Sequence, residues 1–280
     1  MIPTYEKLVS HIAQLPDCMI AFSGGVDSAV VAKAAYLALG DQAIAVTGVS
    51  ASLATGELET AQRITESIGI QHEIVRTDEL SQQGYLDNQP NRCWHCKTEL
   101  YDQLGQLAQR LGKSILLNGA NADDLGDFRP GMQAATENQV LSPLAECGFN
   151  KATVREIAQH WELEVWDKPA TPCLSSRVVY GLDITPERLA RIDAAEQFLR
   201  ELGLQSVRVR YHHDDLARLE VALSDLPRLC ESGIREQVSN KLRELGFRYI
   251  TLDLEGFRSG SFQQLVPAEQ LLQYVSKSSD

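Results

Sequence analysis

The chain carries one segment whose residue types suit a phosphate group, Ser23-Gly24-Gly25-Val26-Asp27-Ser28. The two glycines let the backbone close on phosphate without a Cβ in the way, and the serine hydroxyls are hydrogen-bond donors. Asp27 is suitably placed for Mg²⁺ or for capping a helix. The alternative is an ordinary strand–helix turn with serine caps. The residue types favour nucleotide binding and leave the second substrate undefined.

Cysteines form the second group. Cys93 and Cys96 have a Cys-x-x-Cys spacing, and Cys173 lies far downstream. Cysteines at this spacing can reach one metal ion or cluster, and a further thiolate makes three ligands. Three ligands to a 4Fe–4S cluster leave one iron open to a non-protein ligand, which is a reactive arrangement. A zinc site that adds His95, and a redox dithiol, are the alternatives. The remaining cysteines are interpreted as packed or incidental thiols: Cys18, Cys147 and Cys230.

Polar residues also follow an expected strand, in Asn118-Gly119-Ala120-Asn121-Ala122-Asp123-Asp124. The paired carboxylates of Asp123 and Asp124 suit Mg²⁺ bound to pyrophosphate, and a solvated turn rich in Asn and Asp is the alternative. Lys97, directly after Cys96, can offset phosphate charge during transfer of an adenylyl group.

Strand alternation places Arg208 and Arg210 on the same face of a strand. Two guanidiniums side by side repel each other unless an anion joins them, and arginine binds phosphate and carboxylate well. Arg258 is expected to extend this patch; exposed arginines paired with surface acids are the alternative. His212-His213-Asp214 is interpreted as a turn at the strand end, because adjacent strand residues point to opposite faces. The nearby acids of interest are Glu196, Glu220 and Asp253.

The elements that must position these groups alternate between strand and helix. Apolar runs, helical spacing and terminal glycines predict strands at residues 19–22, 43–49, 70–75 and 114–117, and helices at 26–39, 57–68, 97–111 and 153–161. This alternation predicts an α/β fold, a doubly wound parallel sheet that binds ligands at its carboxyl edge. The loop at residues 23–28 therefore opens a helix, whose free N–H groups and positive dipole end favour an anion.

The pattern changes beyond residue 181. Thr185 is expected to cap a helix that runs to Leu202. Strands at residues 207–211, 219–223 and 248–254, with a helix at 237–245, predict a smaller C-terminal α+β domain. The first of these strands alternates strictly and is expected to be half-buried. We place the boundary near residue 175, which gives a nucleotide-binding domain over residues 1–174 and a C-terminal domain for substrate binding or oligomerisation over residues 175–280.

The composition is that of a globular protein with a full core: 280 residues, 44% hydrophobic and 23% charged. No apolar stretch has the length of a membrane span and the N-terminus lacks a signal-peptide core, so we expect a cytoplasmic protein without a membrane partner. The net charge of −12 disfavours a nucleic-acid partner. Cysteines of a cytoplasmic chain are more consistent with ligands, catalysts or core residues than with disulfides.

Residues 23–28 resemble the PP-loop of the ATP pyrophosphatases, which split ATP between its α and β phosphates. Over nearly its full length the chain is similar to the LarE family, the ATP-dependent sulfur transferases of nickel-pincer cofactor synthesis. The segments that match are Ser23–Ser28, Asn91–Lys97, Asn118–Asp124, Gly126–Gly131, Pro172–Arg177, Val207–Arg210 and Asp253–Ser261.

The resemblance implies a reaction in two stages. A carboxylate of pyridinium-3,5-biscarboxylic acid mononucleotide, a small-molecule nucleotide, attacks the α-phosphate of ATP and pyrophosphate leaves. A sulfur nucleophile then displaces AMP and a thiocarboxylate results. The expected catalytic residues are Cys173, Lys97 and Asp27, and ATP and Mg²⁺ would lie on the PP-loop and on Asn118, Gly119, Asp123 and Asp124. The expected substrate-binding residues are Ser176, Arg177, Glu196, Arg208, Arg210, Asp253 and Arg258.

The source of sulfur differs between branches of the family. In one branch a cysteine that matches Cys173 gives up its own sulfur and becomes dehydroalanine. Cys93 and Cys96 are also present here, which resembles the other branch, in which three cysteines hold a 4Fe–4S cluster. The open iron would carry a renewable sulfide, supplied by a donor protein. Family members tend to assemble, so a homo-oligomer is expected.

Two further classes are open. A tRNA thiolation enzyme could use the same loop and cysteines, but the acidic charge balance argues against it. A non-catalytic nucleotide sensor with a structural zinc would leave Arg208 and Arg210 without a purpose.

Overall fold

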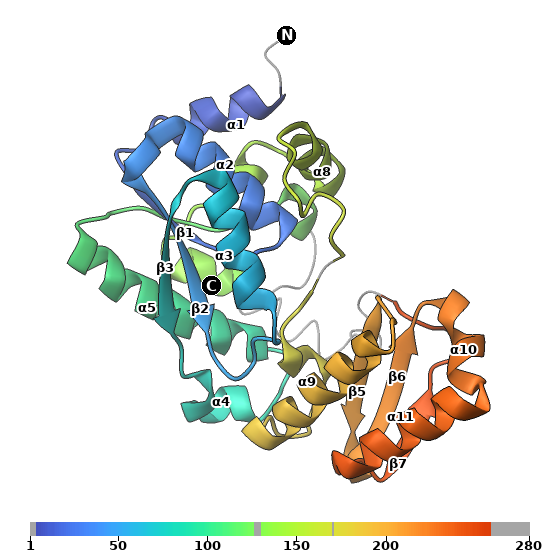
Figure 1. Ribbon diagram of the computed structural model, residues 1–280. Coiled ribbons are helices and arrows are strands. Elements are labelled where there is room, and N and C mark those ends of the chain that lie inside the picture. Colours follow the sequence, from blue (N-terminus) through green and yellow to red (C-terminus); the bar gives the residue numbers. More distant parts are fainter. Residues whose placement is uncertain (1–3, 126–129, 170, 259–280) are drawn as a thin grey trace.

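The computed structural model describes residues 4–125, 130–169 and 171–258. It forms two units (Figure 1): a four-stranded sheet covered by helices, and a three-stranded sheet with its own helices. The motif residues 126–129 and 259–261 lie outside the described residues. None of the described helices is both long enough and apolar enough to cross a membrane.

The first sheet is parallel, with the strand order β3-β2-β1-β4. Its strands are β1 (Cys18–Ala21), β2 (Ala43–Val49), β3 (Gln71–Arg76) and β4 (Leu116–Leu117). The helices of this unit are α1 (Thr4–Ile12), α2 (Val26–Leu39), α3 (Glu57–Ile68), α4 (Gln83–Leu86), α5 (Arg92–Leu111), α6 (Pro130–Glu137), α7 (Pro143–Glu146) and α8 (Lys151–His160). The predicted α/β fold with a parallel sheet is confirmed.

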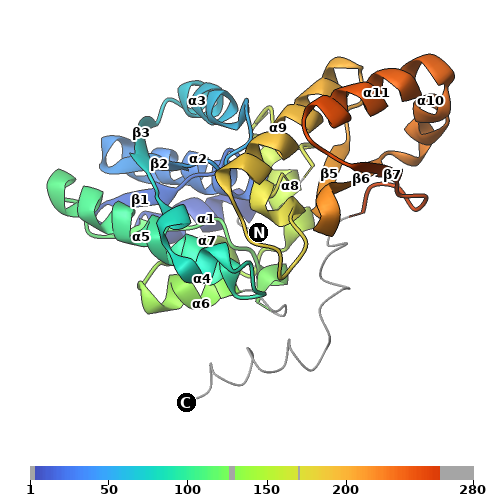
Figure 2. The same cartoon turned by 90° about the horizontal axis from the view of Figure 1, so that it is seen from below.

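Successive residues of β1 face opposite helical layers, because side chains alternate along a strand. Cys18 and Ile20 pack with residues of α1, α2, α3 and α8. Met19 and Ala21 pack with residues of α5 and α6. Figure 2 shows α3 and α5 on opposite sides of the sheet. Both faces of the inner strands β1 and β2 are therefore buried, which explains why these two strands read as apolar runs, whereas the edge strand β3 is polar and only partly buried.

Helix α5 begins at Arg92, earlier than the predicted start at Lys97. The apolar spacing that marks a helix begins only near Tyr101 and Leu104, which are buried against the sheet. The first turns of α5 are polar and carry Cys93 and Cys96, so periodicity could not reveal them as helical.

The second sheet has the strand order β5-β6-β7, with β5 and β6 antiparallel and β6 and β7 parallel. Its elements are α9 (Pro186–Glu201), β5 (Val207–His212), β6 (Leu216–Val221), α10 (Leu226–Cys230), α11 (Ser232–Glu244) and β7 (Tyr249–Leu252). Val209 and Tyr211 of β5 pack into the core with α9 and α11. The prediction that β5 is half-buried is wrong, because Arg208 and Arg210 on its other face are only 4% and 3% exposed.

The core of the second unit includes residues of the first. Ala54, from the loop after β2, and Tyr85 of α4 pack with Leu174 and with the apolar side of α9. The first sheet ends with β4 and the second begins with β5, but the hydrophobic core does not divide between the two units.

Candidate active site

The loop between β1 and α2 is closed by its own serines. Ser28 Oγ donates to the carbonyl of Gly25 (3.0 Å) and lies 3.2 Å from Ser23 Oγ. Gly24 has a φ of +68°, and a Cβ there would lie 3.3 Å from Cα of Ala61 in α3. The backbone thus needs glycine at this position. The first turn of α2 carries N–H groups without intrahelical acceptors, which favours an anion in front of it.

Gly119, in the loop after β4, lies against the same turn of α2. A Cβ at Gly119 would lie 2.8 Å from the backbone nitrogen of Ser28, so a side chain would force the two loops apart. The loops after β1 and β4 meet where the strand order reverses, and open α/β sheets bind ligands at this point. The position of a nucleotide site follows from the topology as well as from the loop sequence.

Gly119→Ala is expected to weaken ATP binding by about tenfold or more, because the added Cβ displaces the first turn of α2. Isothermal titration of the full chain with ATP and Mg²⁺ measures this loss. Gly105→Ala is the matched control, since a Cβ at this α5 position meets no atom within 4 Å. Equal ATP affinities for Gly119→Ala and wild type would contradict the assigned site.

Asp27 is the carboxylate that faces this edge of the sheet together with Asp124. Asn121 Nδ2 donates to Asp27 Oδ1 at 2.9 Å. Burial raises the pKa of Asp27, the hydrogen bond from Asn121 lowers it, and the nearby Asp124 raises it again. Two carboxylates at one edge fit Mg²⁺, which proteins bind through one or two carboxylates plus phosphate oxygens. Asp123 is exposed and accepts the backbone N–H of Lys151 at 3.0 Å, so it is not part of this pair.

The three cysteines of the predicted cluster site lie within electrostatic reach of one another. Cys93 and Cys96 stand on the first turns of α5, and Cys173 directly precedes the 3₁₀ turn η4 (Leu174–Arg177). Burial raises the pKa of the Cys96 thiol, and Cys173 and then Glu79 raise it further.

The thiols of the predicted cluster site come from two separate segments of the chain. Among the described residues, no three side chains of His, Cys, Asp or Glu are arranged to hold one metal ion. A 4Fe–4S cluster is ligated through separate irons, so its cysteines need not converge on one point. His95 packs on α4 instead, where a Cβ at Gly84 would lie 2.3 Å from its ring. This contact disfavours His95 as a fourth ligand.

Lys97 places a positive charge beside these cysteines. Its Cγ would lie 3.2 Å from a Cβ on Gly131 at the start of α6, and its Nζ lies 6.0 Å from the ring centroid of Tyr101. Burial lowers the pKa of Lys97, but Tyr101 and the cysteines raise it to a net value above the ordinary one. Lys97 is therefore a cation at neutral pH.

The segment that carries Cys173 is tied to α4 and α5. Arg92 Nη1 donates to the carbonyl of Ser175 (2.8 Å) and to Asn88 Oδ1 (2.7 Å). Tyr85 Oη and Ser175 Oγ are 2.5 Å apart. From the sequence, no role was assigned to Tyr85, Asn88 or Arg92. Arg92 lies inside Asn91–Lys97, a segment similar to the family, and this position could have indicated its role. These contacts fix Cys173 on the side of Cys93 and Cys96.

Arg177 and Glu196 form a buried ion pair behind Cys173. Their side chains are 1% and 0% exposed, and Arg177 Nε donates to Glu196 Oε1 at 3.0 Å. Arg177 Nη1 also donates to the carbonyl of Cys173 (3.1 Å) and to that of Pro172. Glu196 Oε1 accepts the backbone N–H of Val209 at 3.1 Å. This geometry favours holding the Cys173 segment on β5 over direct contact with a substrate.

Glu196→Ala is expected to lower the free energy of unfolding by about 3–5 kcal/mol, because it leaves the Arg177 charge buried and uncompensated. Urea denaturation measures the loss. Glu187→Ala, which removes the ion pair between the exposed Glu187 and Arg191 on the same helix, is the control and is expected to cost less than about 1 kcal/mol. Equal losses for the two variants would contradict the structural role of Glu196.

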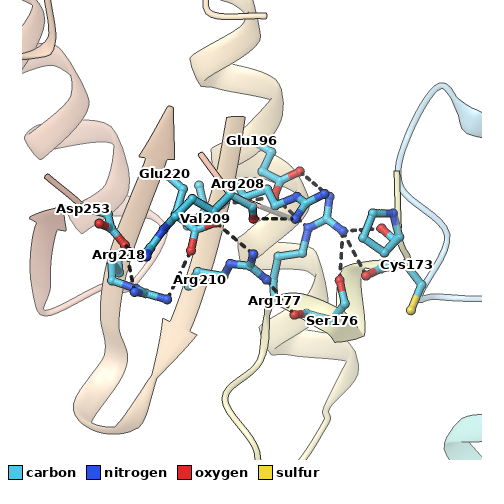
Figure 3. Close-up of polar contacts among 12 residues, drawn as sticks. Cys173, Ser176, Arg177, Glu196, Arg208, Val209, Arg210, Arg218, Glu220 and Asp253 are labelled. Atoms are coloured by element: carbon cyan, nitrogen blue, oxygen red, sulfur yellow. Dashed lines mark hydrogen bonds and ion pairs between the residues drawn. The ribbon is translucent and has the colours of Figure 1, made fainter. Parts of the chain in front are cut away.

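A row of arginines continues from Cys173 across the second sheet (Figure 3). Arg210 donates to the carbonyl of Ser176 at 2.9 Å and to Glu220 Oε2 at 2.8 Å. Arg218 contacts Glu220 Oε1 at 3.2 Å and Asp253 Oδ2 at 2.9 Å. The segment that carries Cys173 and the arginine row are thus directly connected.

Arg208 stands in the same row, with its guanidinium 4.4 Å from the ring centroid of Phe257. Burial lowers the pKa of Arg208 to about 10, and the charges of Arg210 and Arg177 add to this effect. Arg258 Nη2 lies 3.5 Å from Asp253 Oδ2 at the far end of the row. Cations gathered in a buried place are stabilised by an added anion, which is the electrostatic property of a phosphate site.

Comparison with known proteins finds relatives over nearly the full length of this chain. No family model matches the chain. An uncharacterized protein of Synechocystis sp. is 46% identical over 93% of this chain and 97% of its own length. The pyridinium-3,5-bisthiocarboxylic acid mononucleotide synthase of Lactiplantibacillus plantarum is 36% identical over 96% of each chain. A tRNA-specific 2-thiouridylase of Brucella suis is 30% identical, over 54% of this chain and 47% of its own length.

The parallel sheet, the PP-loop and these relatives define an ATP-dependent enzyme that transfers sulfur. The similarity to the thiouridylases spans only about half of the chain, whereas the similarity to the mononucleotide synthase is nearly complete. The chain belongs to the LarE family.

Proposed function

We propose that the enzyme converts the carboxylates of pyridinium-3,5-biscarboxylic acid mononucleotide to thiocarboxylates. The observation that carries the proposal is the connection between the Cys173 segment and the arginine row, through Arg210 and the carbonyl of Ser176. A sulfur site and a phosphate site on one segment suit a substrate that has a phosphate at one end and a carboxylate at the other. The product named for the Lactiplantibacillus plantarum enzyme is a mononucleotide with two thiocarboxylic acid groups, as thiolation of such a substrate would give.

The first stage activates a carboxylate, because a bare carboxylate has no adequate leaving group. A carboxylate oxygen attacks the α-phosphorus of ATP, the bond to the β-phosphate oxygen breaks, and an acyl adenylate forms. The loop from Ser23 to Ser28 supports the phosphates, and Asp27 and Asp124 would hold Mg²⁺, which offsets charge on the departing pyrophosphate. Lys97 adds a further positive charge at this stage.

The second stage forms a carbon–sulfur bond. The sulfur nucleophile attacks the acyl carbon, the carbon–oxygen bond breaks and AMP departs with the electron pair. Cys93, Cys96 and Cys173 would hold a 4Fe–4S cluster, which supplies an exchangeable sulfide when it is bound. Arg177 and Arg92 hold the Cys173 segment between α5 and β5 while the substrate is bound. Direct sulfur donation from Cys173 is the second candidate, supported by its position at the edge of the arginine row.

The phosphate of the mononucleotide would lie on Arg208 and Arg210, so that the pyridinium ring extends toward Cys173. Cytoplasmic location, a homo-oligomeric state and a donor protein for sulfide stay predictions.

The direct test incubates the full chain with the mononucleotide, ATP, Mg²⁺ and sulfide under anaerobic conditions. AMP and pyrophosphate are the expected nucleotide products, and each converted carboxylate gains the mass difference between sulfur and oxygen. An ATP analogue that cannot be cleaved between its α and β phosphates is the control. Formation of ADP and phosphate, or an unchanged mononucleotide beside an accepted tRNA, would contradict the proposal.

A further inference from the structure

A buried carboxylate outside the predicted site stands close to the cysteines. Glu79 opens the 3₁₀ turn η2 (Glu79–Ser81) that follows β3, and it is 1% exposed. A buried carboxylate requires hydrogen-bond donors, since removal from water is costly. The hydrogen bonds of Glu79 therefore indicate which segment of the chain it holds in place.

Both donors come from the loop after β2. Ser50 Oγ donates to Glu79 Oε1 at 2.5 Å, and Ser52 Oγ donates to the same oxygen at 2.6 Å. The two serine oxygens are 2.8 Å apart, and the backbone N–H of Ser52 donates to Ser50 Oγ at 3.2 Å. One carboxylate oxygen thus fixes the whole turn from Ser50 to Ser52. Short hydrogen bonds to an ionisable acceptor are stronger than neutral ones.

The turn from Ser50 to Ser52 holds the residue next to Cys173. The carbonyl of Ser52 accepts the backbone N–H of Leu174 at 2.8 Å. Leu174 is 2% exposed and packs with Ala54 and Tyr85, so its main chain has little freedom. A continuous path of hydrogen bonds leads from Glu79 through Ser52 to the peptide that joins Cys173 and Leu174.

The second carboxylate oxygen adds an independent observation. Glu79 Oε2 is buried and accepts no hydrogen bond from any residue that the structure describes. A buried polar atom left in this state is costly, and such atoms gather at functional sites. Glu79 is also near enough to Cys96 and Tyr85 to act on both electrostatically.

We propose that Glu79 is a positioning residue for sulfur transfer, which through Ser52 sets where the sulfur of Cys173 lies relative to Cys96. This inference rests on the proposed function for its sulfur-transfer test. Among the described residues Glu79 makes its hydrogen bonds to Ser50 and Ser52 and none to the PP-loop or its carboxylates, so the adenylation stage does not depend on it. Misplacement of a reacting group by about 1 Å is sufficient to cost about a hundredfold in rate.

Glu79→Leu is therefore expected to lower sulfur transfer to pyridinium-3,5-biscarboxylic acid mononucleotide by about a hundredfold, while ATP–pyrophosphate exchange stays within about threefold of wild type. Glu79→Gln keeps an oxygen that accepts from both serines and is expected to restore most of the transfer. Ser52→Ala removes one hydrogen bond of the path with a smaller change in side-chain volume. It is expected to lower sulfur transfer and to leave ATP–pyrophosphate exchange unchanged, and it replaces Glu79→Leu if that variant does not fold.

Glu99→Leu is the matched control. Glu99 accepts the backbone N–H of Asp78 at 3.2 Å and the side-chain N–H of Gln82 at 3.1 Å. It holds the same η2 segment from the other side without a link to Ser52, so its loss is expected to leave sulfur transfer unchanged.

A second readout needs no substrate. In the iron-free full chain, the rate at which iodoacetamide alkylates Cys173 is expected to rise at least about fivefold in Glu79→Leu, because the segment opens more often. The exposed Cys230 serves as internal standard in the same peptide map. Wild-type protein that fails to thiolate the mononucleotide contradicts the proposed function. The ratio of Cys173 to Cys230 alkylation then still tests whether Glu79 positions Cys173.

Three results would overturn the inference: sulfur transfer at the wild-type rate in Glu79→Leu, equal losses of exchange and transfer, or a Glu79→Gln variant as impaired as Glu79→Leu. An unchanged alkylation ratio between Cys173 and Cys230 would also overturn it.

Discussion

Replacing Cys96 with alanine is expected to lower multiple-turnover sulfur transfer by about a hundredfold or more, while pyrophosphate release stays within about threefold of wild type. The reason is that Cys96 would be one of three cluster ligands, and two remaining thiols do not hold a cluster with one open iron. The first stage as proposed uses the PP-loop, Asp27, Asp124 and Lys97 but not the Cys96 thiol, so it keeps its residues.

The measurement combines turnover with iron and sulfide analysis of anaerobically purified protein. Cys230→Ala is the control, because Cys230 is exposed on α10 in the second unit. A Cys96→Ala protein that performs a single turnover and converts Cys173 to dehydroalanine would establish direct sulfur donation instead. A brown wild-type protein that keeps Cys173 intact after turnover supports the renewable source.

Arg208→Ala is expected to raise the KM for the mononucleotide by about tenfold to a hundredfold, equivalent to the about 1.5–3 kcal/mol of a hydrogen bond to a charged group. Burial, and to a lesser degree the charges of Arg210 and Arg177, hold the pKa of Arg208 below the ordinary value, at about 10. Arg208 nevertheless stays charged at neutral pH. A phosphate bound there gains both hydrogen bonds and relief of repulsion.

The matching nucleoside without its phosphate makes the test specific. Its KM is expected to be high with the wild-type enzyme and unchanged by Arg208→Ala. Arg235→Ala, at a site with a 63% exposed side chain, is the control for general loss of charge. An equal effect of Arg208→Ala on nucleotide and nucleoside would show that Arg208 supports the fold rather than the phosphate.

The fold of the first unit could be predicted because its signals are local. The predicted helices at residues 26–39 and 57–68 coincide with α2 and α3. In both, the apolar residues at helical spacing mark the helix and a glycine marks its end. Strand β2 is equally well defined by its apolar run. The start of α5 was missed, because its first turns are polar and gain their packing from α4 and η4 rather than from their own pattern.

The residues of the candidate site could be predicted from the sequence, but the contacts between them could not. Sequence identified the PP-loop, the cysteines and the paired arginines. It grouped Asp123 with Asp124, whereas the structure groups Asp27 with Asp124 across the strand-order reversal. It offered Arg177 and Glu196 as substrate contacts, and their mutual burial depends on the packing of α9 on β5, which no short motif encodes. The alternative of exposed arginines paired with surface acids is wrong in the exposure, because Arg208 and Arg210 are buried, but Arg210 does pair with an acid, Glu220.

The hydrophobic core that both units share limits how this scaffold can be recombined. Tyr85 and Ala54 precede the change of sheet by many residues, yet they pack under α9. A chimera that exchanges only the chain after residue 174 would set foreign side chains against these two. One that also carries α4 and the loop after β2 keeps the packing whole. The packing of the second unit is therefore inherited as a block that includes α4 and the loop after β2.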